Sequence, residues 1–382
     1  MLVSHKIKLN PLNPNPEYRF ILSGGGTGGH IFPAIAIAQA LGQQMPQSKV
    51  LFVGAQGKME MERVPAQGFE IVGIPISGLQ RKWTLKNLKL PFQIIYSLWS
   101  CRKILKTFKP HVVIGTGGYA SGPLLFTASL MKIPVCIQEQ NSYPGITNKI
   151  LSKYAKRIYT GFPHMEPYFN ASKIVYTGNP VRNTLEPLKI TKSEAVHFFN
   201  LQTQQKTLLV LGGSLGARPL NQALYSIYET LLESDIQIIW QTGGAHFKEY
   251  KDKVKQHKGL YLIDFIANME FAYAASDLII SRAGASSLSE LMAVLKPAIL
   301  VPSPYVAEDH QTKNAQALVR ANAAVLLPEQ HLNRDLKNRV LELLQSPEQL
   351  KSLTQQLLPL QKQQASMQIA KDVINLLKTE LP

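Results

Sequence analysis

One stretch near the amino terminus decides the fold: RFILSGGGTGGH, from Arg19 to His30. Its short apolar run, Arg19–Ser23, enters a cluster of glycines, and a helical pattern begins at about Ile31. The same theme recurs in four later apolar runs that each end at a glycine-containing loop: His111–Ile114, Thr207–Leu211, Ile236–Trp240 and Leu278–Ile280. Nearly continuous apolar strands that alternate with helices predict parallel sheets covered by helices on both faces.

Two of these glycine loops lie in the first half of the chain and three in the second. Loops at the carboxyl ends of parallel strands occupy the position where doubly wound folds bind their ligands. The sequence therefore predicts an α/β protein with two Rossmann-like doubly wound domains that face each other across a cleft.

Breaks in the periodicity divide the chain into four expected segments. Gly, Asn and Pro within Thr177–Arg182 interrupt the pattern and mark the boundary between the domains. Beyond about Gln345 the leucines stand at helical spacing, and this tail could pack onto either domain. We expect a flexible extension, a first domain, a second domain and a helical tail over residues 1–17, 18–180, 181–350 and 351–382.

Composition excludes several classes of protein. The chain has 382 residues, of which 45% are hydrophobic and 17% charged, which argues against a wholly disordered chain and against a polytopic membrane protein. Its only cysteines, Cys101 and Cys136, form neither a disulfide framework nor a tetrahedral metal site, so a reducing compartment is expected. The longest apolar runs fall short of the ~20 residues that span a bilayer, and residues 1–18 lack the apolar core of a signal peptide.

The net charge of +16 is concentrated in the first half of the chain. Residues 1–165 carry 19 Lys+Arg against 5 Asp+Glu, whereas residues 166–382 carry 22 against 20. From Ile71 to Gln138 there is no Asp or Glu at all, against nine Lys or Arg. Such asymmetry indicates a polyanionic partner, either nucleic acid or anionic lipid; the alternative is the general bias of a basic proteome.

The first glycine loop satisfies the G-x-G-x-x-G pattern with Gly24, Gly26 and Gly29. A nicotinamide site would also need a carboxylate after the second strand, and Val50–Val53 is followed by Gly54–Gly57 instead. No glycine loop continues into Gly-Lys-Ser/Thr, so a P-loop is excluded. What remains is a backbone cradle for a diphosphate at a helix start, or glycines that only permit the turn.

Candidate side chains follow several of these loops. His30 could act as a general base near neutral pH, or could be a capping or core histidine. Ser286 and Ser287 could cap a helix or bond a phosphate, and Glu290 could complement the helix dipole or accept sugar hydroxyls. Gln311 with Asn314 would form an amide pair for hydroxyl recognition. The chain has no Asp-x-Asp and no His/Cys/carboxylate cluster at ligand spacing, so we expect neither a metal nor a cofactor.

Six motifs run in register from about Tyr18 to about Ala370: Gly25–His30 with Pro33, Gly115–Tyr119, Glu139–Asn141, Gly178–Arg182, Gly212–Ala217 and Ser281–Ala285. Together they resemble the MurG family of glycosyltransferases, although any one of them alone would not be specific. The resemblance implies the GT-B fold and an inverting transfer of GlcNAc from UDP-GlcNAc to the C4 hydroxyl of undecaprenyl-diphospho-MurNAc-pentapeptide (lipid I). The product, lipid II, serves peptidoglycan synthesis. The one departure is an amino-terminal extension of about 16 residues, which touches no motif.

On matching positions, the resemblance implies a donor site held mostly by the second domain. Ser214 would bond a phosphate, Ile266 would offer its backbone to the uracil, and Glu290 would take the ribose hydroxyls. Gln311 would bind the GlcNAc hydroxyls. The complete implied donor set is Thr27, Gly28, Gly29, Asn141, Arg182, Ser214, Ile266, Ala285, Ser286, Ser287, Leu288, Ser289, Glu290 and Gln311.

The first domain would hold the acceptor. The resemblance implies that four residues of the first two loops face the acceptor diphosphate and sugar: Gly26, Gly117, Gly118 and Tyr119. His30 is the expected catalytic base and Glu139 the alternative. UDP would leave into helix N-termini and Arg182 rather than onto a metal.

A lipid-linked acceptor would explain the excess positive charge of the first half of the chain. Basic residues beside Trp and Phe within Leu85–Phe108 suit an interfacial contact with an anionic leaflet; a core-facing helix with a solvated basic face is the alternative. The residues expected to touch the membrane are Lys82, Trp83, Lys86, Lys89, Phe92, Trp99, Arg102 and Lys103. We therefore expect a peripheral protein on the cytoplasmic face of the inner membrane, with other cell-wall synthesis and division proteins as further partners.

Two other classes of protein remain open at this point. A lipid-A-disaccharide synthase or a UDP-GlcNAc 2-epimerase would share the second-domain features, but would not need the Gly-Thr-Gly-Gly-Tyr loop. A nucleic-acid-binding protein would account for the charge, yet the chain has no helix-turn-helix, RNP or zinc-finger signature, so no nucleic acid is expected as a partner.

Overall fold

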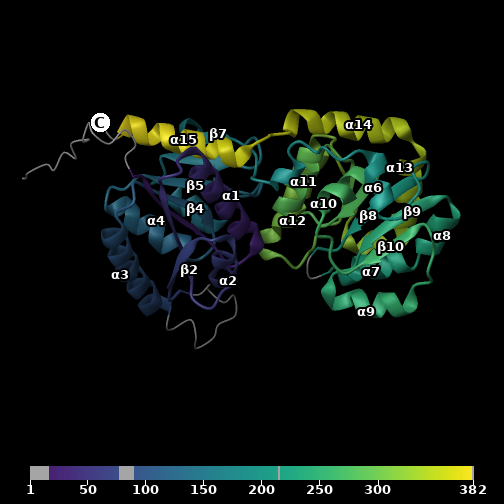
Figure 1. The fold of residues 1–382 in the computed structure, drawn as a ribbon, viewed down its shortest axis with the longest axis horizontal. Helices are drawn as coiled ribbons and strands as arrows, with labels where there is room; N and C mark the ends of the chain where they lie inside the picture. Colours follow the sequence, from purple (N-terminus) through teal and green to yellow (C-terminus); the bar gives the residue numbers. More distant parts are fainter. Residues whose placement is uncertain (1–16, 77–89, 214–215, 381–382) are drawn as a thin grey trace, which may run out of the picture.

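A computed structural model describes residues 17–76, 90–213 and 216–380 of the chain. Within them, two parallel sheets lie side by side along the long axis of the molecule, each flanked by its own helices (Figure 1). This confirms the predicted fold class of two Rossmann-like domains. The predicted extension, except for Glu17, lies outside the described residues, as do Lys82, Trp83, Lys86, Lys89 and Ser214.

The first sheet has the strand order β3-β2-β1-β4-β5-β6-β7, and each neighbouring pair is parallel. Because the order reverses between β1 and β4, the loops after these two strands lie next to each other at the switch point where such folds bind ligands. Its strands are β1 (Arg19–Gly24), β2 (Lys49–Ala55), β3 (Glu70–Ile74), β4 (Val112–Gly117), β5 (Val135–Glu139), β6 (Arg157–Thr160) and β7 (Ile174–Tyr176). The helices of this part are α1 (Gly28–Gln44), α2 (Glu60–Arg63), α3 (Leu90–Phe108), α4 (Ser121–Leu130) and α5 (Ile146–Leu151).

The second sheet repeats the arrangement with the order β10-β9-β8-β11-β12-β13, again all parallel. Its switch point lies between β8 and β11. The strands are β8 (Lys206–Leu211), β9 (Ile236–Gln241), β10 (Leu260–Ile263), β11 (Leu278–Ser281), β12 (Ala298–Leu300) and β13 (Val325–Leu326). The helices are α6 (Lys192–Phe198), α7 (Arg218–Tyr225), α8 (Tyr228–Glu233), α9 (Gly244–Lys253), α10 (Met269–Ala275), α11 (Ala285–Val294), α12 (His310–Arg320), α13 (Leu332–Gln345) and α14 (Pro347–Leu357).

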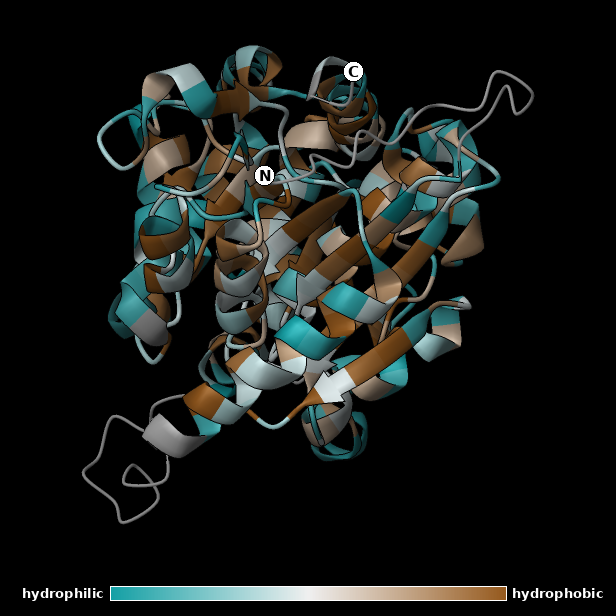
Figure 2. Ribbon diagram, turned by 90° about the vertical axis from the view of Figure 1, so that its left-hand side faces the viewer, coloured by the Kyte–Doolittle hydropathy of each residue, from teal (hydrophilic) through white to brown (hydrophobic). Residues whose placement is uncertain are grey.

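The apolar runs that the sequence assigns to strands are confirmed as β1, β2, β4, β8, β9 and β11. They read as continuous apolar runs because both faces of each sheet are covered. Ile21 and Leu22 are neighbours in β1 and are both fully buried, yet they belong to hydrophobic clusters on opposite faces of the sheet. Figure 2 shows the resulting apolar strands running through the interior beneath more polar helices.

The carboxyl-terminal tail divides between the two domains. Leu350 and Leu353 of α14 pack into the core of the second domain. The last helix, α15 (Ala365–Glu380), crosses back and lies over α1 of the first domain (Figure 1). Ile369 and Val373 of α15 are fully buried there, in the same cluster as Ile37. The first domain therefore completes its core with residues from the far end of the chain.

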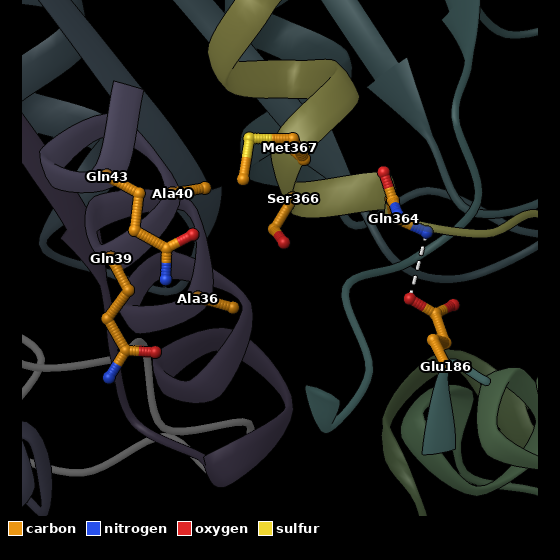
Figure 3. Close-up of a pocket in the computed structure, with 8 residues that line it drawn as sticks. All are labelled: Ala36, Gln39, Ala40, Gln43, Glu186, Gln364, Ser366 and Met367. Carbon is orange, nitrogen blue, oxygen red and sulfur yellow. Dashed lines mark hydrogen bonds between the residues drawn. The ribbon is translucent and has the colours of Figure 1, made fainter. Parts of the chain in front are cut away.

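The chain crosses between the domains twice, near Glu186 and near Gln364, and these two crossings contact each other. Glu186 in the first crossing accepts the backbone N–H of Gln364 in the second at 2.9 Å. These residues, with α1 and the start of α15, line a cavity of about 220 Å³ (Figure 3). None of the predicted site residues lines this cavity. Among the described residues, no helix is both long and apolar enough to cross a bilayer.

Candidate active site

The carboxyl edges of the two sheets meet at the domain junction. Asn314 of α12 accepts the backbone N–H of Ser142 at 2.9 Å and donates to Asn141 Oδ1 at 3.1 Å. Asn179, which follows β7, donates to Ser289 Oγ of α11 at 2.8 Å. Each of these residues follows the carboxyl end of a strand. The segments that follow β5 and β7 are therefore brought together with the helices that follow β11 and β12.

The first two glycine loops interlock within that junction. The N–H of Gly25 donates to the carbonyl of Gly117 at 3.3 Å. Gly117 has φ +103°, and a Cβ atom on it would lie 2.9 Å from Cδ2 of the His30 ring. Gly118 has φ +89°, and its Cβ would lie 2.4 Å from the carbonyl oxygen of Gly25. Only glycine fits at these two positions, because the ring and the first loop occupy the space.

Contacts at the ring and at the backbone orient the His30 side chain, whose Nδ1 also lies 3.3 Å from Thr27 Oγ1. Its Nδ1 lies 3.0 Å from the carbonyl oxygen of Gly25, and Thr116 Oγ1 donates to the His30 carbonyl at 2.7 Å. A carbonyl can only accept, so we assign the ring proton to Nδ1, which leaves the Nε2 lone pair beside Gly117. Burial lowers the pKa of His30, and the nearby His310 lowers it further against the opposing Gly25 hydrogen bond. A neutral imidazole with a free Nε2 has the properties of a general base.

Two helices have uncapped N-termini near the junction. α1 begins after Thr27 and α11 begins after Gly284, and neither has a side-chain cap or an acidic residue in its first turn. Their first N–H groups therefore have no intrahelical acceptor, and the dipole favours an anion there. Ser286 is exposed and Ser287 partly exposed, but neither caps the helix.

The other predicted donor residues at the start of α11 are more buried than the sequence suggested. Leu288 is fully buried, and its N–H already donates to the Gly284 carbonyl at 3.0 Å. Ser289 is buried too, and its hydroxyl donates to the Ala285 carbonyl at 2.7 Å. Ala285 is at the edge of burial and offers its backbone N–H as the first residue of the helix. The packing therefore disfavours the predicted donor contact of these two side chains: Leu288 lies in the core of the second domain, and Ser289 is also bonded by Asn179 across the junction.

The two side chains of the predicted amide pair on α12, Gln311 and Asn314, differ in how far they are already bonded by the protein. Asn314 is fully buried, and its side-chain amide already bonds Ser142 and Asn141 across the junction. Its Nδ2 also donates to the Ala283 carbonyl at 3.4 Å. Gln311 is only partly buried, and its Oε1 accepts the N–H of Ser303 at 2.8 Å, which leaves its amide NH₂ for a ligand. Only Gln311 of the pair is placed to meet a sugar hydroxyl.

Three of the predicted donor residues gather at one corner of the second domain. Oε1 of Glu290 lies 3.4 Å from Nε of Arg182, and its Oε2 accepts the Tyr273 hydroxyl at 2.7 Å. Arg182 also donates to the carbonyl of Ala267 at 3.4 Å, next to Ile266, whose buried side chain leaves only backbone to offer. Burial raises the pKa of Glu290, while Arg182 and Tyr273 act to lower it.

Both carboxylate oxygens of Glu139 accept hydrogen bonds from the loop and the helix that follow it. One carboxylate oxygen accepts from the N–H and side chain of Asn141 at 2.9 and 3.2 Å. The other accepts from the N–H of Gly145 at 3.1 Å and from Nδ2 of Asn148 at 2.8 Å. Burial raises the pKa of Glu139, and these hydrogen bonds oppose that effect. With 1% of its surface exposed, Glu139 orients Asn141 and is not placed to take a substrate proton.

The remaining predicted residues lie near the rim of the junction or on α3. Gly26 has open space where a Cβ would stand, Thr27 is exposed, and Gly28 and Gly29 are partly exposed. Tyr119 is 52% exposed before α4. Phe92 lies in α3, and the side chains of Trp99, Arg102 and Lys103 in the same helix are exposed.

Sequence reasoning missed Glu60. This residue opens α2, is 1% exposed, and accepts the N–H groups of Ala55 and Gly26 at 3.0 Å each. The feature that could have revealed it was its rarity, since it is one of five acidic residues in 1–165. Over the described ranges, no group of three or more His, Cys, Asp or Glu gathers in a way that could hold a metal ion.

The chain matches known proteins over nearly its whole length. Residues 20–160 match the glycosyltransferase family 28 N-terminal domain, and residues 207–373 match the family 28 C-terminal domain. A UDP-N-acetylglucosamine–N-acetylmuramyl-(pentapeptide) pyrophosphoryl-undecaprenol N-acetylglucosamine transferase from Porphyromonas gingivalis is 48% identical, covering 97% of this chain and 99% of the relative. Its namesake from Parabacteroides distasonis is 46% identical, with 94% and 99% covered.

A solved structure agrees with this. The crystal structure of MurG from Acinetobacter baumannii superimposes with a TM-score of 0.77 at 27% identity, covering 94% of this chain and 100% of that one. The residues that form the two switch-point loops thus lie in a fold shared with a known transferase. The chain belongs to glycosyltransferase family 28 and, within it, to the MurG family of UDP-N-acetylglucosamine–N-acetylmuramyl-(pentapeptide) pyrophosphoryl-undecaprenol N-acetylglucosamine transferases.

Proposed function

We propose that this chain transfers GlcNAc from UDP-GlcNAc to the C4 hydroxyl of undecaprenyl-diphospho-MurNAc-pentapeptide, with inversion at the anomeric carbon. The observation that carries the proposal is the 46–48% identity over 94–97% of the chain to transferases named for that donor and acceptor. The geometry supports it, because a neutral imidazole and two uncapped helix N-termini lie near one domain junction.

The donor occupies the second domain in this proposal. Its diphosphate lies at the start of α11 with Ser286 and Ser287, where the helix dipole and open N–H groups favour negative charge. The ribose hydroxyls meet Glu290, the uracil meets the backbone of Ile266, and the GlcNAc hydroxyls meet the free amide of Gln311. Leu288 and Ser289 take no part, since the protein interior uses them.

Residues of the first domain complete the donor site from across the junction. Thr27, Gly28 and Gly29 approach the sugar and diphosphate from the start of α1, whose N-terminus is uncapped. Asn141 is fixed by two hydrogen bonds of its own, one to Glu139 and one to Asn314. This support explains how an amide in a loop could keep a fixed orientation toward the sugar.

The acceptor lies against the first two glycine loops. Gly26 and Gly118 both have positive φ, and Gly26 has open space beside it, so backbone there can approach a diphosphate closely. Tyr119 is exposed beside them and offers an aromatic face to the acceptor sugar. Gly117 keeps the Nε2 side of His30 open toward this acceptor.

The chemical step needs one base and one stabilised leaving group. His30 Nε2 takes the proton of the C4 hydroxyl as the oxygen attacks the anomeric carbon of GlcNAc. The bond from that carbon to the diphosphate oxygen breaks, and UDP leaves with the electron pair. The N-terminus of α11 and the guanidinium of Arg182 stabilise the negative charge that develops on UDP. His30 then returns its proton to solvent.

The lipid acceptor requires a membrane-facing surface, and the first domain offers one. Large exposed apolar side chains gather on the neighbouring helices α3, α4 and α5: Ile94, Ile95, Tyr96, Trp99, Leu130, Ile146 and Ile150. The exposed Arg102 and Lys103 continue the α3 part of this surface. An apolar patch with adjacent basic residues suits a peripheral contact with an anionic leaflet.

Vesicle binding tests that contact. Arg102→Gln with Lys103→Gln should weaken binding to vesicles containing anionic lipid about 10–30-fold, because each basic residue near such a surface contributes about 1 kcal/mol. The matched control is Lys248→Gln with Lys337→Gln, two exposed lysines of the second domain. An equal loss in both double variants, or a loss of UDP affinity in the first, would contradict the assignment.

The transfer itself is tested with labelled UDP-GlcNAc and lipid I, with and without a chelator. We expect a labelled disaccharide-lipid at the same rate in both arms. Formation of UDP-N-acetylmannosamine without any acceptor would instead identify an epimerase. A strict requirement for a divalent cation would contradict the metal-free departure of UDP.

A further inference from the structure

His30 and the buried Glu60 bind the same peptide group from opposite ends. The group is the one that joins Gly25 to Gly26. Its carbonyl oxygen lies 3.0 Å from Nδ1 of His30, and its N–H donates to Oε2 of Glu60 at 3.0 Å. A single amide therefore connects a carboxylate to the imidazole.

The surroundings of Glu60 are built to hold this arrangement. Its other oxygen accepts the N–H of Ala55 at 3.0 Å, so both oxygens are fixed. A Cβ on Gly25 would lie 2.1 Å from Oε1 of Glu60, and a Cβ on Gly54 would lie 2.6 Å from its Cγ. Two glycines from different strand ends thus make room for one buried carboxylate, since Glu60 is 1% exposed.

We propose that Glu60 is a positioning residue for the transfer reaction, holding His30 in the Nδ1–H tautomer through the Gly25–Gly26 peptide group. A carboxylate that accepts from the N–H of an amide polarises it, and the carbonyl at its other end becomes a stronger acceptor. That carbonyl then keeps the imidazole proton on Nδ1 and leaves the lone pair on Nε2. Carboxylates that bind a catalytic histidine directly have the same effect; here the effect passes through one peptide group.

The inference rests on the proposed function, in which His30 is the base. Two charged or titratable groups act on the ring: Glu60 from α2 raises the pKa of His30, and His310 from α12 lowers it. The connection from Glu60 to His30 through the Gly25–Gly26 peptide group, here called the peptide link, also accounts for the glycine-rich sequence at this point. Gly26 adopts φ +81°, a conformation that glycine tolerates, while its N–H meets the carboxylate.

Glu60→Gln tests the rate and its pH dependence. A glutamine has one acceptor oxygen, so either Ala55 or Gly26 loses its partner and the negative charge disappears. We expect kcat to fall about 10–100-fold, as is typical when the partner that orients a catalytic ligand is removed. Because Glu60 raises the pKa of His30 and the base must be neutral, the acid limb of the kcat profile should move to lower pH. UDP affinity should stay within about twofold.

Glu62→Gln is the matched control, since it changes a carboxylate of the same helix that is exposed. It should change neither rate nor pH profile. In a His30→Ala background, Glu60→Gln should cost nothing further, because residues that act as a unit are not additive. The contrary outcome has two parts: Glu60→Gln lowers kcat by the same factor in the His30→Ala background as in the wild type, and the single variant leaves the acid limb unmoved. Those two results together would show that Glu60 is merely structural and would overturn the proposal.

The tautomer can be read first in the wild-type protein, which keeps that part of the test independent of folding and of activity. ¹⁵N spectra of the wild-type protein with labelled histidine should show the His30 proton on Nδ1, and Glu60→Gln should reduce that preference. An Nε2–H tautomer in the wild type would refute the peptide link even if the transferase is active. Conversely, absence of GlcNAc transfer with the expected tautomer would leave the link standing and refute the proposed function.

Discussion

Replacing Gly117 with alanine would displace the His30 ring while leaving the histidine itself unchanged. The new Cβ would lie 2.9 Å from Cδ2 and 3.0 Å from Nε2, whereas ordinary contacts of this kind are 3.4–4 Å. The ring must recede by about 0.5–1 Å to restore a favourable contact. Because a misplacement of about 1 Å in a reacting group can cost about 10²-fold, we expect kcat to fall about 10–100-fold. That loss corresponds to about 1.4–2.7 kcal/mol in the activation barrier.

Backbone strain must be separated from this local effect. Gly117 has φ +103°, so alanine there also costs about 1–3 kcal/mol of folding stability. Gly57→Ala is the matched control, because Gly57 lies in the same domain at φ +68° with open space where the Cβ would stand. Both variants should lose comparable stability in thermal unfolding, but only Gly117→Ala should lose kcat.

The assay is the initial rate of GlcNAc transfer to lipid I at saturating UDP-GlcNAc, with UDP affinity measured by calorimetry. UDP affinity should be unchanged in both variants, since the proposed donor site lies mainly on the second domain. A kcat for Gly117→Ala within about threefold of wild type, or an equal kcat loss in Gly57→Ala, would refute the reasoning.

Three further outcomes are expected. Glu290→Gln removes the partner of Arg182 and should raise the KM for UDP-GlcNAc about 10–100-fold while sparing the KM for lipid I; an unchanged donor KM would contradict the assignment. Burial raises the pKa of Cys101 and Cys136 to about 12, so neither thiol should react with a disulfide reagent at pH 8 until the protein is unfolded. Ile369→Ala opens the fully buried contact between α15 and α1 and should cost about 2–5 kcal/mol in urea unfolding. A cost well below 1 kcal/mol would show that α15 is not part of the core of the first domain.

Local sequence patterns predicted the sheets and the loops because those features depend on neighbours in the chain. An apolar run followed by glycines is visible in any window, and the strands β1, β4, β8, β9 and β11 appear where the runs stand. The helix after the first loop begins at Gly28, ahead of the expected Ile31, since the last glycines form its first turn.

The errors and omissions concern contacts between distant parts of the chain. Asn314 is 172 residues from Ser142, and only the docking of the domains shows that its amide is already used. Ser289 is engaged by Asn179 for the same reason, 110 residues away. Glu60 reaches Gly26 over 34 residues, a distance at which no helix or strand periodicity applies. These pairings are set by how the two domains dock and by which strands lie adjacent in the first sheet, and no local pattern encodes either.

We propose that His30 acts as the base in the transfer of GlcNAc to the lipid acceptor. The most direct test is the single-turnover rate of His30→Ala with bound UDP-GlcNAc and excess lipid I, compared with wild type above pH 7. Loss of a general base predicts a fall of about 10²–10⁴-fold with unchanged UDP-GlcNAc affinity. A fall of less than about tenfold would contradict the account and leave His30 with a positioning role only.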